Sequence, residues 1–132
     1  MTYQLTVDQK PTYLHFVVSG QNSQRSVQRY MEDVLRECTV RQCFRVLVEE
    51  RLEGPRLGTL QVFSMVASGS ERFRGVLQAM AYVDVNARGD LMRFAENVAV
   101  NRAIPLKVFA TVAEAERWLL ERPAEPATRP PP

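Results

Sequence analysis

The sequence has few of the residues that metal centres, redox sites and many active sites require. It contains one histidine and two cysteines. Cys38 and Cys43 form no CxxC pair, and the chain has no disulfide framework. Gly-x-Ser-x-Gly, P-loop and Gly-x-Gly-x-x-Gly motifs are also missing. These absences argue against an enzyme, and we expect neither a cofactor nor a metal ion.

Strong charge of either sign is missing as well. The formal net charge is +2, and the positive residues are almost all arginines scattered along the chain. Such a balance does not favour nucleic acid or an anionic membrane as a partner. No apolar run reaches the length of a membrane span and no signal peptide opens the chain. We therefore expect a cytoplasmic protein with no integral membrane segment.

The 132 residues suffice for one domain with a hydrophobic core. Five of the last ten residues, 123–132, are prolines, a composition typical of a segment without regular structure. The sequence thus predicts a single α/β domain over residues 1–122 and a proline-rich tail over 123–132.

The run Phe-Arg-Val-Leu-Val-Glu at 44–49 predicts a strand buried on both faces, as at the centre of a parallel sheet. Alternating residues at 3–7 and 13–19 predict two half-exposed strands joined as an antiparallel hairpin. Further strands are expected at 76–84 and 106–109. Together they predict a five-stranded, mostly parallel sheet with an antiparallel edge at its N-terminal end.

Helical periodicity separates these strands. An apolar stripe runs from Val27 to Cys38, with Asn22 or Ser23 as the N-cap. A second helix is expected from Thr59 and a third after Asp90. A capping box of Thr111 and Glu114 opens the last helix. The predicted order is β-β-α-β-α-β-α-β-α, with the helices packed on the sheet.

Several segments together resemble a known bacterial family. They are the central Val46–Glu49 strand, the run Phe94–Arg102, and the ending from Val108 to Leu119. These segments are similar to the SpoIIAA-like family, which is related to STAS domains, the sulfate-transporter and anti-sigma-factor-antagonist fold. The resemblance covers roughly Tyr3 to Leu120. It implies a STAS-like fold and a regulatory, protein-binding role.

Two positions depart from that pattern. Family members commonly have glycine where Ala103 stands, which suggests that Asn101 or another turn ends the preceding helix. The phosphorylatable Asp-Ser-Ser-Gly motif of the regulatory antagonists is also missing from the segment after the central strand. Thr59 takes a similar place, but an N-cap is the simpler interpretation. Regulation by phosphorylation at the usual serine is therefore not expected.

A binding site in an open α/β sheet lies outside the carboxyl ends of the strands. The candidate interaction rim there comprises Glu49, Glu50, Glu53, Thr59, Asp84 and Arg88. Its four carboxylates could converge, bind a cation or raise one another's pKa. Arginines in the same loops favour solvated ion pairs instead.

Three functions remain open from the sequence. The first is a non-enzymatic regulatory module that binds a protein partner, and a homodimer is a further alternative. The second is a carrier of a small apolar or lipid-like ligand. The side chains that could line its pocket are Phe63, Met65, Phe73, Met80 and Met92. The third is an enzyme. An enclosed apolar cavity would favour the carrier, an exposed apolar patch the module, and a buried carboxylate pair facing a cleft the enzyme.

Overall fold

The computed structural model describes residues 3–54, 64, 75–84, 89–102 and 104–121. Their strands form one five-stranded sheet in the order β1-β2-β3-β4-β5. The strands are β1 (Tyr3–Gln9), β2 (Leu14–Gln21), β3 (Arg45–Glu53), β4 (Ala79–Asp84) and β5 (Leu106–Phe109). β1 pairs with β2 in antiparallel fashion and the other pairs are parallel. The predicted sheet is confirmed.

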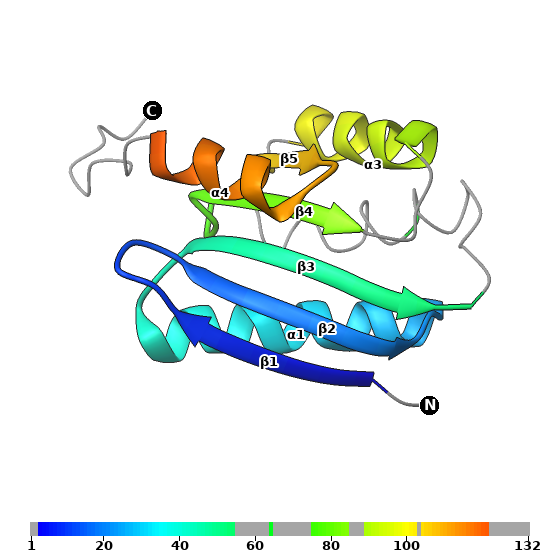
Figure 1. Ribbon diagram of the computed structural model, residues 1–132, viewed down its shortest axis with the longest axis horizontal. Helices are drawn as coiled ribbons and strands as arrows, with labels where there is room; N and C mark the ends of the chain where they lie inside the picture. Colours follow the sequence, from blue (N-terminus) through cyan, green and yellow to red (C-terminus); the bar gives the residue numbers. More distant parts are fainter. Residues whose placement is uncertain (1–2, 55–63, 65–74, 85–88, 103, 122–132) are drawn as a thin grey trace.

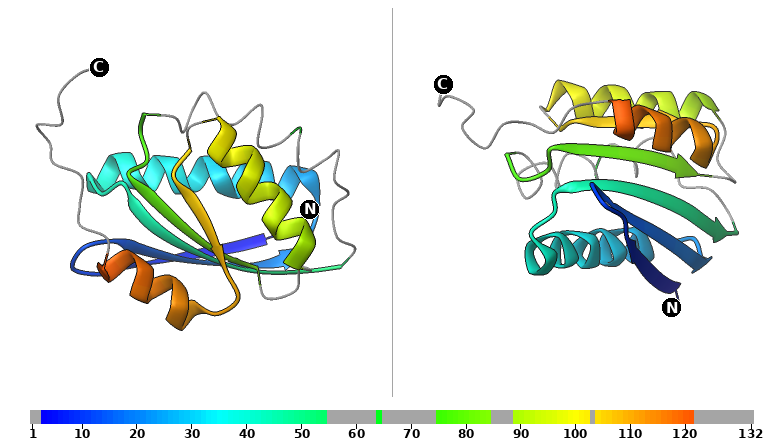
Figure 2. Two further views of the ribbon diagram at one scale, coloured as in Figure 1. Left: turned by 90° about the horizontal axis from the view of Figure 1, so that it is seen from above. Right: turned by 60° about the vertical axis from the view of Figure 1, so that its left-hand side comes forward.

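The described helices lie on both sides of this sheet (Figures 1 and 2). Helix α1 (Gln24–Arg41) covers one face, and α4 (Val112–Glu121) covers the other. Helix α3 (Gly89–Asn101) lies along β5. The helix expected from Thr59 falls outside the described residues, apart from Ser64, which is helical. No helix in the described ranges is both long and apolar enough to cross a membrane.

Strand periodicity divides the core into two layers. On the α1 side, alternate residues of the central strands, such as Phe16 and Val48, pack against Tyr30 and Val34 of the helix. On the α4 side, Leu47 packs with small residues of β4 and with Ala115 and Leu119. The sheet therefore buries both of its central faces, as the apolar run at its centre predicts.

Helix α1 begins and ends with specific caps. The Ser23 side chain accepts a hydrogen bond from the Ser26 backbone N–H at 3.0 Å, so Ser23 is the N-cap. At the other end Gln42 adopts a left-handed conformation with φ of 54°, and its backbone N–H bonds to the carbonyls of Cys38 and Thr39. Cys38 is fully buried, in agreement with a packing role.

Two strand boundaries differ from the sequence prediction by three residues or more, and the other ends differ by at most two. β3 was expected to end at Glu49 but continues to Glu53, because β2 extends beside it and Gln21 pairs with Glu53. β4 begins at Ala79, not at Val76, which lies in an exposed turn. The last residues of β3 are mostly polar, so the sequence pattern does not extend the strand over them. Val76 and Leu77 before β4 are apolar, so the pattern starts that strand too early.

A buried arginine ties the loop before β2 to the end of α4. Arg45 is 6% exposed; its Nη2 donates to the Leu119 carbonyl, and its Nε donates to the Thr12 carbonyl at 3.2 Å. The carbonyl of Leu119 belongs to the last turn of α4, where backbone acceptors have no partner within the helix. At the start of α4, Thr111 Oγ1 accepts from the Glu114 N–H, as the capping box predicts.

Candidate functional site at the carboxyl ends of the strands

The acidic residues at the end of β3 do not converge. Glu49 and Glu50 both lie within the strand, so their side chains point to opposite faces of the sheet. Glu50 pairs in register with Asp84 of β4 and shares its face. Glu49 lies on the α4 side instead. The expectation of four carboxylates meeting at one rim is therefore wrong for Glu49.

Glu50 is the centre of a buried polar cluster. It is 2% exposed, and its Oε1 accepts hydrogen bonds from the Tyr30 and Tyr82 hydroxyls. These two hydroxyl oxygens lie 2.9 Å apart. Tyr30 comes from α1 and Tyr82 from β4, so the cluster joins the helix to two strands. Sequence periodicity assigns Tyr30 to the apolar stripe of α1 and gives no sign of this polar contact.

The environment of Glu50 favours its neutral form. Burial raises the pKa of its carboxyl group to about 8, with further upward contributions from the hydrogen bond to Asp84 and from the Asp84 charge. The hydrogen bonds from Tyr30 and Tyr82 act in the opposite direction. At neutral pH the Glu50–Asp84 pair thus holds a proton that two separate carboxylates would have lost.

Burial also acts on the two tyrosines. It raises the pKa of Tyr30 and of Tyr82 well above the ordinary value, and the nearby Glu50 carboxyl adds to the rise. Both hydroxyls therefore stay protonated and serve as hydrogen-bond donors. The cluster is a set of satisfied polar groups inside the α1-side core.

Glu49 forms a separate group on the opposite face. It is 6% exposed, and its Oε1 lies 3.0 Å from His15 Nε2 of β2. Its Oε2 accepts a hydrogen bond from Arg51 Nε at 2.6 Å. The single histidine of the chain is therefore satisfied by a carboxylate on the neighbouring strand. The two adjacent glutamates have different roles because the strand separates their environments.

The remaining rim residues do not extend either group within the described structure. Glu53 is exposed at the end of β3, and its backbone carbonyl accepts from the Asn22 N–H at 2.7 Å. Thr59 and Arg88 lie outside the described residues. In the ranges that the structure describes, no three His, Cys, Asp or Glu side chains are placed to hold a metal ion.

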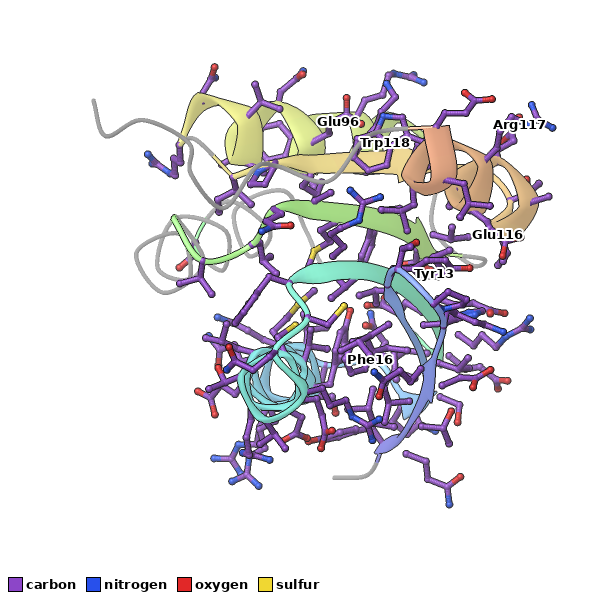
Figure 3. The ribbon with its side chains drawn as sticks, turned by 90° about the vertical axis from the view of Figure 1, so that its left-hand side faces the viewer. Tyr13, Phe16, Glu96, Glu116, Arg117 and Trp118 are labelled. Carbon is purple, nitrogen blue, oxygen red and sulfur yellow. The ribbon has the colours of Figure 1, made fainter. Side chains whose placement is uncertain are left out.

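A second surface, which sequence reasoning missed, is a groove beside β5. Its lining residues are Glu96 and Val100 of α3, Ile104 to Lys107, and Trp118 of α4. Figure 3 labels Glu96 and Trp118. It is an open groove of about 490 Å³. Val100 is 56% exposed, a large value for an apolar side chain. The only sequence signal is that Val100 lies off the buried stripe of its helix.

Two contacts hold the walls of this groove. Glu96 Oε1 accepts a hydrogen bond from the Val108 backbone N–H at 2.8 Å, which fixes α3 against β5. The rings of Phe109 and Trp118 lie 5.6 Å apart in a tilted arrangement, which joins β5 to α4. Trp118 is half-buried, although the helical stripe assigns it to the buried face. These contacts connect both of the helices that line the groove to β5.

Comparison with solved structures identifies the fold. The chain is similar to an anti-sigma factor antagonist from Mycobacterium paratuberculosis, with 14% identity, a TM-score of 0.56, and coverage of 91% of this chain and 96% of that one. It is also similar to an uncharacterized DUF3478 protein with a SpoIIAA-like fold from Shewanella loihica PV-4. The identity is 18% and the TM-score 0.55, and 89% of this chain and 93% of that one are covered. No family model and no curated protein matches the sequence.

These likenesses define an α/β domain with the SpoIIAA-like fold. They cover 91% and 89% of this chain. The predicted fold and its STAS-like class are confirmed. At these levels of identity the structural likeness concerns the fold, and the function has to be argued from the surfaces of this chain.

Proposed function

We propose that this chain is a non-enzymatic regulatory module that binds a protein partner through the groove beside β5. The observation that carries the proposal is the open groove itself, which is lined by the exposed Val100 (56%) and the half-buried Trp118. Apolar side chains left open to water beside an aromatic residue are typical of protein-binding surfaces. The anti-sigma factor antagonist among the similar structures supports a regulatory role.

The groove also suggests the chemistry of the partner. Most of its lining residues are apolar, and Glu96 and Lys107 are the charged ones. A partner segment with one or two apolar anchors and flanking polar residues would match this pattern. Interfaces of this kind draw most of their binding energy from a few central side chains, often including tryptophan. We therefore expect Trp118 and Val100 to dominate binding.

Binding of a small apolar ligand is the alternative function. Of the five side chains that could line a carrier pocket, Met80 is the one that the structure describes, and it is buried in the α1-side core. The other four lie outside the described side chains. The openness of the groove supports the protein-binding module, since carriers enclose most of a ligand's surface. Native mass spectrometry of protein from its own host would show an added small-molecule mass if the chain is a carrier.

The module is proposed to act without phosphorylation at the usual serine position, because the Asp-Ser-Ser-Gly motif is missing after the central strand. The absence of catalytic motifs supports the non-enzymatic part of the proposal. The buried Glu50 carboxyl is consistent with it, since it accepts its hydrogen bonds from the Tyr30 and Tyr82 hydroxyls inside the core. A cytoplasmic location remains a prediction from the sequence.

The test is site-specific photo-cross-linking in the host cell. A photoreactive residue replaces Val100 in one variant and Val40 in the other, because Val40 is also an exposed valine, at 71%, but near the end of α1. We expect one polypeptide to be cross-linked from position 100 and not from position 40. The purified pair is then used to compare Val100→Asp with Val40→Asp.

We expect Val100→Asp to weaken binding about tenfold or more, equivalent to ~1.4 kcal/mol, and Val40→Asp to leave it unchanged. Equal affinity of both variants for the cross-linked partner would show that the groove is not the docking surface. A bound small molecule in place of a polypeptide would favour the carrier.

A further inference from the structure

Strand β1 forms one edge of the sheet, and within the described residues it pairs with β2 alone (Figure 1). Natural proteins usually protect such edges with proline, lysine, bulges or very short strands. β1 is seven residues long, continuous in its pairing with β2, and free of proline and glycine. Asp8 is its only charged residue. This edge is therefore a template for another strand.

The hairpin geometry shows which backbone groups point outward. The Lys10 N–H donates to the Tyr13 carbonyl at 2.9 Å, so Lys10 and Tyr13 form a hydrogen-bonded pair. Hydrogen-bonded and non-hydrogen-bonded pairs alternate along an antiparallel ladder. The even-numbered residues of β1 therefore bond to β2. Tyr3, Leu5, Val7 and Gln9 direct their N–H and C=O groups to the outer edge.

We propose that two copies of this chain associate through β1, in antiparallel fashion, around a two-fold axis at Thr6. All seven residues of β1 are then paired, and about eight backbone hydrogen bonds form between the copies. A shift by two residues in either direction leaves residues at both ends of the strand unpaired. The two sheets become one continuous sheet, with the two β1 strands at its centre.

The side chains of β1 fit this register. Leu5 lies opposite the second copy's Val7 on the α1 side, where both are half-buried against the core. On the other face the amide of Gln4 lies opposite the second copy's Asp8, and the carboxylate can accept its hydrogen bond. No like charges face each other. This self-complementarity identifies a second copy as the occupant, because a two-fold interface requires one strand to match itself.

Cysteine cross-linking tests the register. Thr6 faces itself as a non-hydrogen-bonded pair, with a Cα separation of about 4.5 Å, which is within the range of disulfides. All cysteine variants carry Cys43→Ser, so that the half-buried Cys43 cannot form disulfides. Cys38 can stay in place, because it is buried and burial raises the pKa of its thiol to about 12. We expect Thr6→Cys to give covalent dimers on mild oxidation. Gln4→Cys and Asp8→Cys should each give none alone and heterodimers when mixed.

Charge substitution tests the association without a covalent bond. The exposed side chain of Thr6 allows Thr6→Lys and Thr6→Glu without loss of core contacts. Each variant should sediment as a monomer, since like charges meet at the axis, and an equal mixture should recover dimers. Thr39→Lys, at an exposed threonine on α1, should dimerise like the unchanged protein.

An unchanged protein that sediments as a monomer up to millimolar concentration would overturn the proposal. So would equal cross-linking of Thr6→Cys and Gln4→Cys, or dimers that persist in both charge variants. The edge is distinct from the groove beside β5. Val100→Asp should therefore leave the dimer intact. Partner binding through the groove and dimerisation through β1 can thus fail independently of each other.

Discussion

Glu49 and Glu50 are neighbours in β3, yet they have opposite surroundings. Glu49 contacts His15 and Arg51 on the α4 side. Glu50 contacts two tyrosine hydroxyls inside the α1-side core. The alternation of the strand gives one carboxylate a histidine and an arginine as neighbours, and the other a buried site that favours its protonated form. The same substitution at the two positions should therefore have different consequences.

The stability of the protein should fall as pH rises because of Glu50. Its pKa is about 8 in the folded state, against an ordinary value of 4.5. Between these limits the folded protein holds a proton that the unfolded chain has lost, so raising the pH favours unfolding. One proton gives a slope of up to ~1.4 kcal/mol per pH unit. Urea unfolding across this pH window measures it.

Glu50→Gln should remove that slope, since an amide resembles the protonated carboxyl group and does not titrate. Glu49→Gln is the matched control and should keep it. If the Glu50→Gln protein loses stability with rising pH as steeply as the unchanged protein, the proton is not held at Glu50.

Removing the Tyr82 hydroxyl should both destabilise the fold and change the titration of Glu50. Tyr82→Phe removes a buried hydrogen bond, at a cost of about 1–2 kcal/mol. It should also raise the pKa of Glu50 further, because the Tyr82 hydrogen bond lowers that pKa. Carboxyl carbon chemical shifts followed against pH would measure it. Tyr13→Phe, which removes a bond to Glu116 on the opposite, α4 side of the sheet, should leave this titration unchanged.

Arg45→Met should loosen the end of α4. The change keeps most of the side-chain volume but removes the donors to the Leu119 and Thr12 carbonyls. We expect a loss of about 2 kcal/mol in the free energy of unfolding. Amide hydrogen exchange should increase mainly in the last turn of α4. Arg36→Met, which breaks an exposed bridge to Asp33, should cost less than ~1 kcal/mol. Equal effects of the two changes would contradict a special role for Arg45.

Glu96→Ala should expose the outer side of β5. Without the carboxylate, the Val108 N–H loses its acceptor, and its hydrogen exchange should become about fivefold faster for ~1 kcal/mol of lost hydrogen bonding. Glu96→Gln retains an acceptor oxygen and should preserve most of the protection. The prediction is wrong if both variants exchange Val108 at the rate of the unchanged protein.

Most of the fold could be predicted from local patterns. Period-two runs marked β1 and β2, and the stripe from Val27 to Cys38 marked α1, because burial of one face imposes these spacings. The end of β3 could not be read in this way. Its last residues are polar, and only the neighbouring β2 keeps them in a strand. Boundaries set by a partner strand leave no periodic signal in the sequence.

The candidate site was predicted less completely. The sequence placed Glu50 and Asp84 together in the candidate rim at the carboxyl ends of the strands. The register of β3 and β4 confirms that they are neighbours. Their tyrosine partners were missed, since Tyr30 fits an apolar stripe and Tyr82 fits a buried strand. A tyrosine ring fits an apolar pattern, and the partner of its hydroxyl group is known only once the helix is packed on the sheet.

The two edge strands of the sheet, β1 and β5, differ in how accessible their backbone groups are to another strand. Glu96 occupies the outward N–H of Val108 in β5, whereas β1 carries no such cover from the described residues. A chain with two open edges could add copies indefinitely and form fibres. If two copies pair through β1 as proposed, the dimer presents a β5 edge at each end, where Glu96 accepts the hydrogen bond of the Val108 N–H. Such an edge is less available to another strand, so the proposed pairing would favour dimers over longer assemblies.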